Sequence, residues 1–572
     1  MNNENVTLEI LEPRGEFTLT KRTGLSTPRV TDLNEKKIGL CSEKPDSVLF
    51  FNKIEEMLKE AYPTATIIRY QSATAPMAPD NTGEIAETCD VWLEGIKTST
   101  SGKFAPDIVL ENLGVPGASV CVDSLIKQRR AHAETGGMPT VRVVTVPAME
   151  YFKAKSSQEL MNDVAAAAFD DIVKALTAPL TEEEREVEDF SYDYSSKKFT
   201  GSTYSQAYEK FLQYCADNFI GDGLPLVPPT REAVDEMLKG TSYPPDKVIG
   251  LMEPRLGFAT VEKIAISAVM AGAKPEYLPV IITMVETITD ENFNQYHIVN
   301  EIMPVMFLSG PIIEELGINN DIGYLAPGYR ANSTIARALS MCSINIGWRV
   351  MDTYASPGGT GQPANYLNYF IPENQKDSPW ESFSESNGYK PDENTITICE
   401  TLSVTRGPSE TLSIASFEQD MERMANIFAP FPGMIGGHRD MSGARYMVVV
   451  HPTFASQLVD AGFTKESFIK WLYDKNTTDW DKMNEEEREQ YKKAVAEGKH
   501  FGIRLEDCKP GLLIEPFTDP RHVAVMVSGN ATGGVLVFWT AMGSTSLVDG
   551  VKEERPFMTK AIHGATLTRS GR

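Results

Sequence analysis

The loop between Gly95 and Gly102 is the first part of the sequence whose residue types suit chemistry, because it carries four consecutive hydroxyl side chains. It follows an expected strand at 90–94, and ligands of an open parallel sheet bind beyond the carboxyl ends of its strands. Hydroxyls and exposed amides there can hold a carboxylate or phosphate; a Ser/Thr-rich turn is the competing interpretation. The residues assigned to this loop are Thr98 and Thr100 for substrate binding and Ser99 and Ser101 for catalysis.

Polar and thiol side chains also end the neighbouring expected strands. Asp123 directly follows the apolar run 118–122, where a carboxylate can act as a general base or cap the next helix. Cys41 and Cys121 end two strands and are either functional thiols or buried small hydrophobes. The seven cysteines contain no CxxC pair and no Cys/His cluster at zinc spacing, so no metal site is predicted.

A second candidate site lies at Arg330–Arg337, where two arginines flank the start of an expected helix. An Asn or Ser N-cap leaves first-turn amides free, and an arginine beside them can bind an anion bidentately. The alternative is that both arginines pair with structural carboxylates. The substrate-binding residues predicted here are Arg330, Asn332, Ser333 and Arg337.

Two further loops complete the set of candidates. His438 lies among glycines beside an arginine and an acid, and histidine titrates near neutrality, so it is the preferred general acid or base. Asn530 lies in the Gly-rich loop after the valine-rich run 523–527 and is a candidate for substrate binding. That loop forms either an oxyanion-type pocket or a tight turn.

The elements that must position these residues alternate between strand and helix over residues 37–147, which predicts a doubly wound, mainly parallel sheet. The expected strands are 37–41, 66–70, 90–94, 118–122 and 141–146. We divide the chain into an α/β domain at 1–178, an acidic linker at 179–203 and a larger α/β or α+β domain at 204–572. Helices expected in the larger domain are 231–238, 261–270, 276–288, 333–343 and 414–428, with strands at 446–450 and 523–527.

The first domain resembles the UGSC family in the segments 6–14, 37–40, 89–95, 110–116 and 137–147. The resemblance implies a plan similar to the selenoprotein subunits of amino-acid reductases. It also implies a selenocysteine or cysteine pair in the loop after the third strand, which suits redox or thiol chemistry. Segments 221–230, 254–272 and 327–339 resemble the large protein often associated with UGSC-like domains, which implies a fusion of two commonly separate proteins.

The sequence departs from the family pattern in that loop, because Lys97–Gly102 contains neither cysteine nor selenocysteine. A hydroxyl cannot replace a thiolate as a redox couple. We therefore expect an enzyme that acts on a small anionic substrate at the junction of the two parts, by elimination or hydrolysis. The alternatives are a reductase that uses Cys41, Cys121 or an added cofactor, and a noncatalytic small-molecule binding protein. The sequence itself indicates no cofactor.

The net charge of −25 disfavours nucleic acid and anionic membranes as partners, because both would repel the protein. No apolar run is long enough to span a bilayer, and the first residues lack the basic and apolar regions of a secretory signal. We expect a cytoplasmic homo-oligomer whose partner is a small-molecule substrate.

Overall fold

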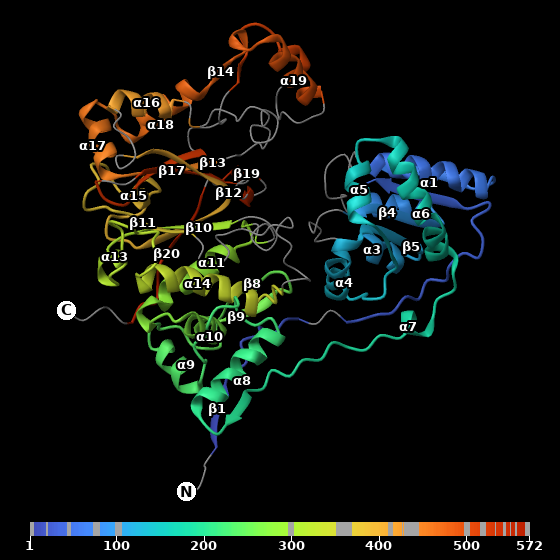
Figure 1. Ribbon diagram of the computed structural model, residues 1–572, viewed down its shortest axis with the longest axis horizontal. Coiled ribbons are helices and arrows are strands. Elements are labelled where there is room, and N and C mark those ends of the chain that lie inside the picture. The colour runs from blue at the N-terminus through green and yellow to red at the C-terminus, as the bar shows by residue number, and fades with distance from the viewer. Residues whose placement is uncertain are drawn as a thin grey trace. The chain divides into compact units, whose positions relative to one another are not determined.

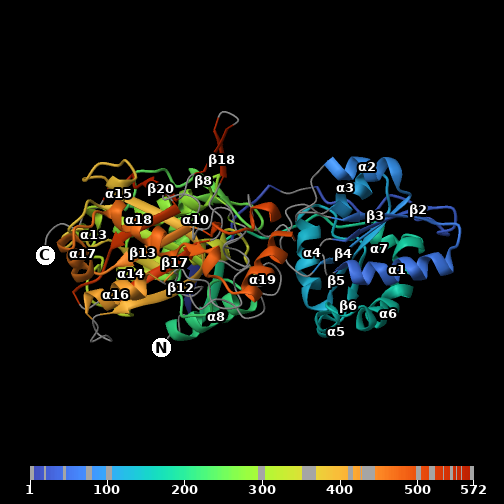
Figure 2. The same ribbon diagram turned by 90° about the horizontal axis from the view of Figure 1, so that it is seen from above.

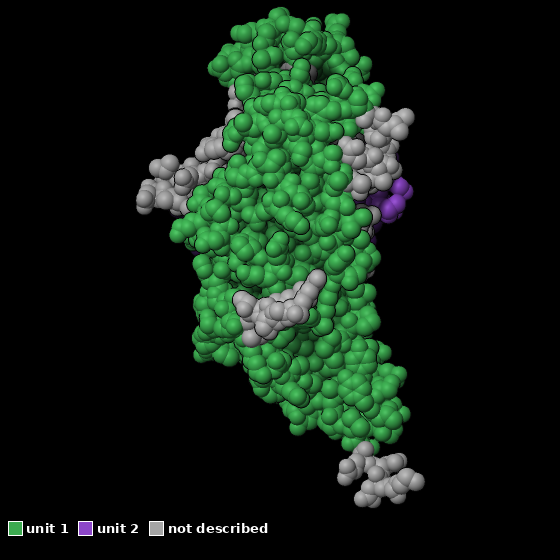
Figure 3. Space-filling model, turned by 90° about the vertical axis from the view of Figure 1, so that its left-hand side faces the viewer, with its two compact units in different colours: residues 1–16, 194–349, 357–572 green, residues 17–193, 350–356 purple. Residues whose placement is uncertain are grey.

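The computed structural model describes residues 5–18, 21–42, 47–71, 80–97, 106–293, 295, 303–350, 369–409, 416–425, 427, 445–496, 504–514, 522–531, 534–540, 545–548, 551–554 and 557–566. The chain forms two compact units. The small unit comprises Phe17–Asp193 with Val350–Ser356, and the large unit comprises Met1–Glu16, Tyr194–Arg349 and Pro357–Arg572. Both are shown in Figures 1 and 2, and Figure 3 draws the large unit in green.

The small unit is built on a sheet of five parallel strands in the order β3-β2-β4-β5-β6. Both faces of this sheet are covered, so the inner strands are apolar along nearly their whole length; every residue of β5 is buried. Their bounds are β2 Lys37–Ser42, β3 Thr66–Gln71, β4 Val91–Lys97, β5 Gly117–Val122 and β6 Val143–Val146.

Helices cover both faces of this sheet, which confirms the doubly wound α/β prediction (Figure 2). One face packs on α1 (Ser47–Ala61), α5 (Ala148–Ala154) and α6 (Gln158–Thr177) through a shared apolar core. The other face contacts α3 (Pro106–Asn112) and α4 (Ile126–Thr135), and α2 (Asp80–Thr88) packs beside α3. The short elements are η1 (Asp123–Leu125) and α7 (Glu182–Arg185).

The large unit begins with the first strand of the chain. β1 (Val6–Ile10) pairs antiparallel with β7 (Lys197–Gly201), so the described residues 5–16 fold with segments that follow the small unit in sequence. A helical layer is packed around this pair and the hairpin β8 (Val248–Met252) and β9 (Gly257–Thr260). Its helices are α8 Tyr204–Asp217, α9 Arg231–Leu238, α10 Val261–Ala271, η2 Pro275–Tyr277, α11 Leu278–Ile288 and α14 Arg330–Asn345.

The main sheet of the large unit has the strand order β11-β10-β12-β17-β13-β16, with β20 also paired to β12. Only β10 with β11 and β13 with β16 are parallel pairs among the described strands of this sheet. The strands are β10 Met303–Ser309, β11 Tyr369–Pro372, β12 Thr395–Ser409, β13 Arg445–Val450, β16 Val523–Val527, β17 Gly534–Thr540 and β20 Met558–Ala561.

This sheet curls so that its edge strands meet. The Asn374 backbone N–H, just after β11, donates to the Val527 carbonyl of β16 at 2.8 Å, and Ser528 Oγ donates to the Pro372 carbonyl at 2.7 Å. One face therefore encloses a hydrophobic core to which six strands contribute side chains. The residues of this core include Val305, Phe307, Ile371, Cys399, Met447, Met526 and Phe538. The other face packs partly on the helical layer and partly on the helices that follow β12 and β13.

Short helices and strands complete the large unit. The helices are α13 Ile312–Glu315, α15 Phe383–Ser386, α16 Phe417–Met424, α17 Pro452–Asp460, α18 Lys465–Asn476, η4 Trp480–Lys482, α19 Glu485–Ala496 and η5 Leu505–Asp507. The strands are β14 Thr478–Asp479, β15 Leu513–Ile514, β18 Thr545–Val548 and β19 Val551–Glu554. Among the helices that the structure describes, none has the length and apolar character needed to span a bilayer.

Candidate functional site in the small unit

The strand order places the expected ligand-binding edge between β2 and β4. The chain passes from β2 to β3 on one side of the sheet and then returns to β4 on the other side, so its direction of winding reverses between these two strands. Ligands of doubly wound sheets bind outside the carboxyl ends of the strands at such a switch point. Here those ends are Ser42 of β2 and Lys97 of β4, with Cys121 of β5 paired in register to Lys97.

A buried group of charged and polar residues, which we call the polar cluster, lies where this edge faces α3 and α4. Its members are Glu94, Lys97, Asp107, Ser119 and Arg129. Ser119 Oγ donates to Asp107 Oδ2 at 2.8 Å, and Arg129 pairs with the same carboxylate and donates from Nε to Ser119 Oγ at 3.3 Å. Four of the five are buried in the sheet or against it, namely Glu94, Asp107, Ser119 and Arg129.

Lys97 is the member of the polar cluster that lies at the carboxyl edge of the sheet. Its Nζ lies 2.9 Å from Glu94 Oε1, and the side chains are 12% and 1% exposed. Two carboxylates and two cations are thus held together in a dry environment, where charge interactions are stronger than in water. Because Lys97 is the last residue of β4, this is the cation nearest to the hydroxyl-rich loop in sequence.

The charges of the polar cluster set the ionisation of their neighbours. Burial opposes the ionisation of Asp107, but Arg129 and Lys97 outweigh burial and hold the pKa of Asp107 below its ordinary value. Burial, with the positive charges of Arg129 and Lys97, lowers the pKa of His132 on α4 to about 4. His132 is therefore neutral at neutral pH and adds no third positive charge to the cluster.

The thiols at the same edge are poor candidates for a redox pair. Cys41 lies on β2 and Cys121 on β5, with β4 between them. Two strand spacings alone separate their Cα atoms by at least roughly 9–10 Å, and Cys41 pairs with Glu94 of β4 whereas Cys121 pairs with Lys97. Disulfide-bonded cysteines need Cα atoms within roughly 7 Å. Burial also raises the pKa of the Cys121 thiol to about 11, against a smaller opposing effect of Arg129, so that thiolate is scarce at neutral pH.

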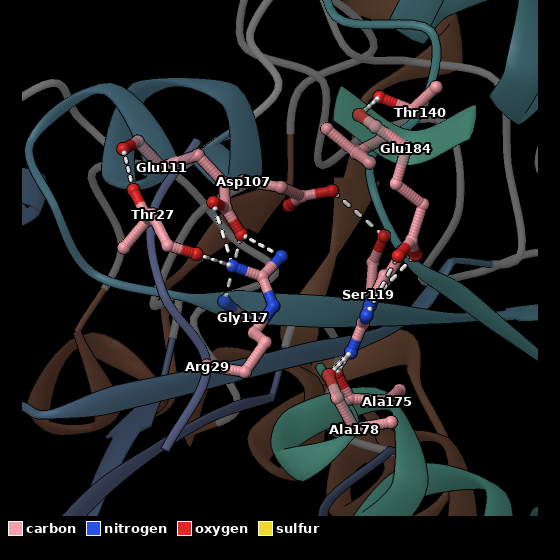
Figure 4. Close-up of polar contacts among 12 residues, drawn as sticks. Thr27, Arg29, Asp107, Glu111, Gly117, Ser119, Thr140, Ala175, Ala178 and Glu184 are labelled. Carbon is pink, nitrogen blue, oxygen red and sulfur yellow. Dashed lines mark hydrogen bonds and ion pairs between the residues drawn. The ribbon is translucent and has the colours of Figure 1, made fainter. Parts of the chain in front are cut away.

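Other polar contacts of the small unit hold its amino-terminal segment against the sheet (Figure 4). The buried Arg29 donates to both carboxylate oxygens of Glu111 at 3.0 and 2.6 Å, and Glu111 also accepts from the Gly117 amide at 3.1 Å. Thr27 Oγ1 donates to the Glu111 carbonyl at 2.9 Å. Burial raises the pKa of Glu111 despite the opposing charge of Arg29. These residues have a structural role because they join three chain segments.

The predicted site residue Asp123 lies at the carboxyl edge and is exposed. Its Oδ1 accepts from the amide of Ala148, the first residue of α5, at 3.1 Å. The carboxylate therefore stabilises the start of a helix that follows the next strand, at the positive end of the helix dipole. A catalytic role for Asp123 stays a prediction.

The arginine site of the large unit differs from the expectation. Arg337 donates from Nε and Nη2 to the two carboxylate oxygens of Asp222 at 2.7 and 2.8 Å, so the structural pairing holds for this residue. Arg330 is exposed and donates from Nε to the Gly272 carbonyl at 2.9 Å. Arg337 is engaged with a structural carboxylate, and of the two only Arg330 keeps an exposed side chain.

The expected N-cap is also wrong, because α14 begins at Arg330 and Tyr329 occupies the cap position. Asn332 is buried and bonds the loop before the helix instead: its Oδ1 accepts from the Asn319 amide at 2.9 Å and its Nδ2 donates to the Asn319 carbonyl at 2.8 Å. The Ser333 amide donates to the Tyr329 carbonyl. Neither residue offers the free cap groups that the anion site needed.

The remaining predicted residues are placed as follows. Asn530 is half-buried in the loop after β16, where the preceding Gly529 amide donates to the Asn320 carbonyl at 3.0 Å. Its role in substrate binding stays a prediction. His438, Thr98, Ser99, Thr100 and Ser101 lie outside the described residues.

A buried carboxylate in the large unit was not singled out from the sequence. Glu373, 1% exposed, follows β11 and accepts from Ser309 Oγ of β10 and from the Phe383 amide at 2.8 Å. Burial raises its pKa to about 7, with Ser309 and Phe383 opposing the shift. The signal available in the sequence was an acid directly after the apolar run Tyr369–Pro372.

Among the described residues, no group of three His, Cys, Asp or Glu side chains is arranged to hold a metal ion. Comparison with protein families shows that residues 9–178 match the UGSC family, so this segment is a UGSC-like domain, as the resemblance predicted. Comparison with curated proteins gave no match. Comparison with solved structures gave none either.

Proposed function

We propose that the UGSC-like domain is the catalytic part of an enzyme and binds a small organic anion at the carboxyl edge of its parallel sheet, with Lys97 as the receiving cation. The observation that carries this proposal is the Lys97–Glu94 pair, 2.9 Å apart, at the end of β4 beside the switch point. An anion that approaches this edge meets an ammonium group whose charge is little screened by water.

The chemistry proposed for this site is acid–base bond cleavage. With the anion held by Lys97, the Glu94 carboxylate, 2.9 Å from Lys97 Nζ, is a group that can accept a proton. In an elimination, it takes a proton from the carbon beside the substrate carboxylate, a carbon–carbon double bond forms, and the leaving group departs with its bonding electrons. In a hydrolysis, it takes a proton from water as the water oxygen bonds to the carbonyl carbon and the π electrons of the carbonyl move onto its oxygen. The C=O bond then re-forms, the bond to the leaving group breaks, and the leaving group departs with its bonding electrons and takes up the proton from Glu94.

Ligand-induced stabilisation of the purified full chain tests the binding step. We expect small carboxylates to raise the unfolding temperature of the wild type, since a ligand at 100 times its Kd adds about 2.7 kcal/mol. Lys97→Met should abolish this shift and Lys97→Arg should retain most of it. Lys53→Met on α1, which removes a half-buried cation far from the sheet edge in sequence, is the matched control. Equal shifts in Lys97→Met and wild type would refute the assignment of Lys97.

Proton exchange separates an enzyme from a noncatalytic binding protein. A carboxylate that shifts the unfolding temperature is incubated with the protein in D2O, and loss of its α-proton signal is followed by NMR. We expect exchange with wild type and none with Glu94→Gln, although Glu94→Gln still binds. Binding in the wild type with neither α-proton exchange nor release of a hydrolysis product would favour the binding protein.

A further inference from the structure

The boundary of the family match differs from the boundary of the small unit. The match begins at residue 9, whereas the small unit begins at Phe17. Residues 9–16 therefore belong by sequence to the UGSC-like segment and by contacts to the large unit. We call residues 6–16 the arm.

The first half of the arm is bound as an added strand. β1 pairs with β7 in antiparallel register from Val6–Gly201 to Ile10–Lys197. Leu8 and Ile10, 7% and 1% exposed, point into the core of the large unit, while Thr7 and Glu9 are exposed. Strand addition of this kind supplies affinity through backbone hydrogen bonds and specificity through alternate side chains.

The second half of the arm is held by the buried side chain of Arg14. Its Nη1 donates to the Ile344 carbonyl at 2.8 Å, and its Nη2 donates to the Asn218 and Phe219 carbonyls at 2.7 and 3.0 Å. These carbonyls lie at the carboxyl ends of α14 and α8, where the helix dipoles are negative. The guanidinium also lies 4.8 Å from the centre of the Trp348 ring.

Backbone contacts fix the register around this anchor. The Leu11 amide donates to the Pro229 carbonyl at 2.9 Å, and the Phe258 amide donates to the Glu16 carbonyl at 2.6 Å. At Gly15 a Cβ atom would lie 2.5 Å from the Ile346 carbonyl oxygen, so only glycine fits. One short segment is thus held by strand pairing, by the hydrogen bonds of Arg14 and by the close backbone contact at Gly15.

We propose that the large unit carries a binding site for the arm of a UGSC-type chain, and that this site recognises the arm without needing the peptide bonds that lead into the small unit. The partner is an extended segment with apolar residues at positions 8 and 10 and an arginine at position 14. A separate polypeptide with this pattern binds in place of the chain's own arm.

The test uses the full chain with a specific protease sequence inserted between Thr18 and Leu19. After native cleavage, we expect the amino-terminal fragment to stay bound to the remaining protein during size-exclusion chromatography. A fluorescent synthetic peptide of residues 1–18 should then exchange into the cleaved protein. Elution of the fragment as a free peptide directly after cleavage would overturn the proposal.

Three variants test whether the contacts of the arm are what retain the cleaved amino-terminal fragment. Arg14→Ala removes three charge-assisted hydrogen bonds and should speed release of the fragment by about tenfold or more, and Gly15→Ala should do the same by steric clash. Arg22→Ala is the matched control, because Arg22 lies beyond the cut and contacts Glu134 and Glu188 of the small unit. If either arm variant does not fold, peptides carrying the same substitutions compete for the cleaved wild type instead. Equal competition by wild-type and Arg14→Ala peptides would overturn the proposal.

Discussion

Glu373→Gln is predicted to stabilise the large unit at alkaline pH and to have little effect at acidic pH. Glutamine is neutral at every pH and retains an oxygen for the Phe383 amide and an NH2 group for Ser309, so it mimics the protonated acid. The substitution therefore removes the titration of a buried carboxylate while keeping its hydrogen bonds.

The magnitude follows from the pKa of Glu373, which burial raises from 4.5 to about 7. The folded state binds the proton more tightly than the unfolded state. Protonation of Glu373 therefore contributes to the unfolding free energy fully below about pH 4.5, and this contribution is lost as the pH rises through 7. The whole shift corresponds to about 3 kcal/mol. About 2.5 kcal/mol of this loss falls between pH 5 and pH 8.

Hydrogen exchange followed by mass spectrometry, on the peptide that contains β10, measures the unfolding free energy of the large unit without contribution from the small unit. The difference between Glu373→Gln and wild type should grow by about 2.5 kcal/mol from pH 5 to pH 8, after correction for intrinsic exchange. Glu314→Gln, at an exposed position of α13, is the control. A difference that stays constant within about 1 kcal/mol would show that Glu373 titrates normally, and the burial argument would fail.

Three other outcomes follow from the described contacts. Arg337→Ala leaves the Asp222 carboxylate, whose side chain is 4% exposed, without its partner and should cost about 3 kcal/mol in urea unfolding. Exposed Arg330→Ala should cost under about 1 kcal/mol; equal costs would contradict the pairing. Burial raises the pKa of Cys121 to about 11 and of Cys342 to about 12, so both thiols should resist alkylation in the folded protein at pH 8. Rapid alkylation of either thiol, detected by mass spectrometry, would contradict their burial. Burial lowers the pKa of His451 to about 4. The stability that the neutral side chain provides is therefore present above pH 6.5 and is lost as the pH falls towards 4. His451→Asn, which can still cap α17, should reduce that loss, and an unchanged slope of unfolding free energy against pH would exclude His451 as its source.

The parallel sheet was predictable because each of its strands can be recognised from the pattern of neighbouring residues in the sequence. Each strand of the small unit contains a short apolar run, and both of its ends lie within three residues of the expected position. The same holds for α9, which spans Arg231–Leu238 as expected, and for the valine-rich strands β13 and β16. Helical and strand periodicity depends only on neighbouring residues.

The polar contacts were not predictable because their partners are distant in sequence. Arg337 pairs with Asp222, which is 115 positions away, and β1 pairs with β7, which follows the small unit in sequence. Asn332 bonds the backbone of Asn319 rather than capping its own helix. A side chain's type indicates that it needs a partner, but only the fold decides which partner it meets.

The polar cluster illustrates the same limit at the candidate site. Glu94 stands out in the sequence as an acid inside an apolar strand. Its neighbour Lys97 directly precedes the hydroxyl-rich loop in sequence, but Asp107 and Arg129 come from two different helices. The sequence predicted the strands whose carboxyl ends form this edge, but it did not predict the buried charges around them.

The pairing of β1 with β7 has a consequence for synthesis on the ribosome. Ile10 is made early, but its strand partner Lys197 is added only after the whole sheet of the small unit has been translated. At about 5–20 residues per second, the first strand waits roughly 10–40 s for its partner. During that interval Leu8 and Ile10 have no core to enter, so the nascent chain carries an exposed apolar segment for which a chaperone would compete.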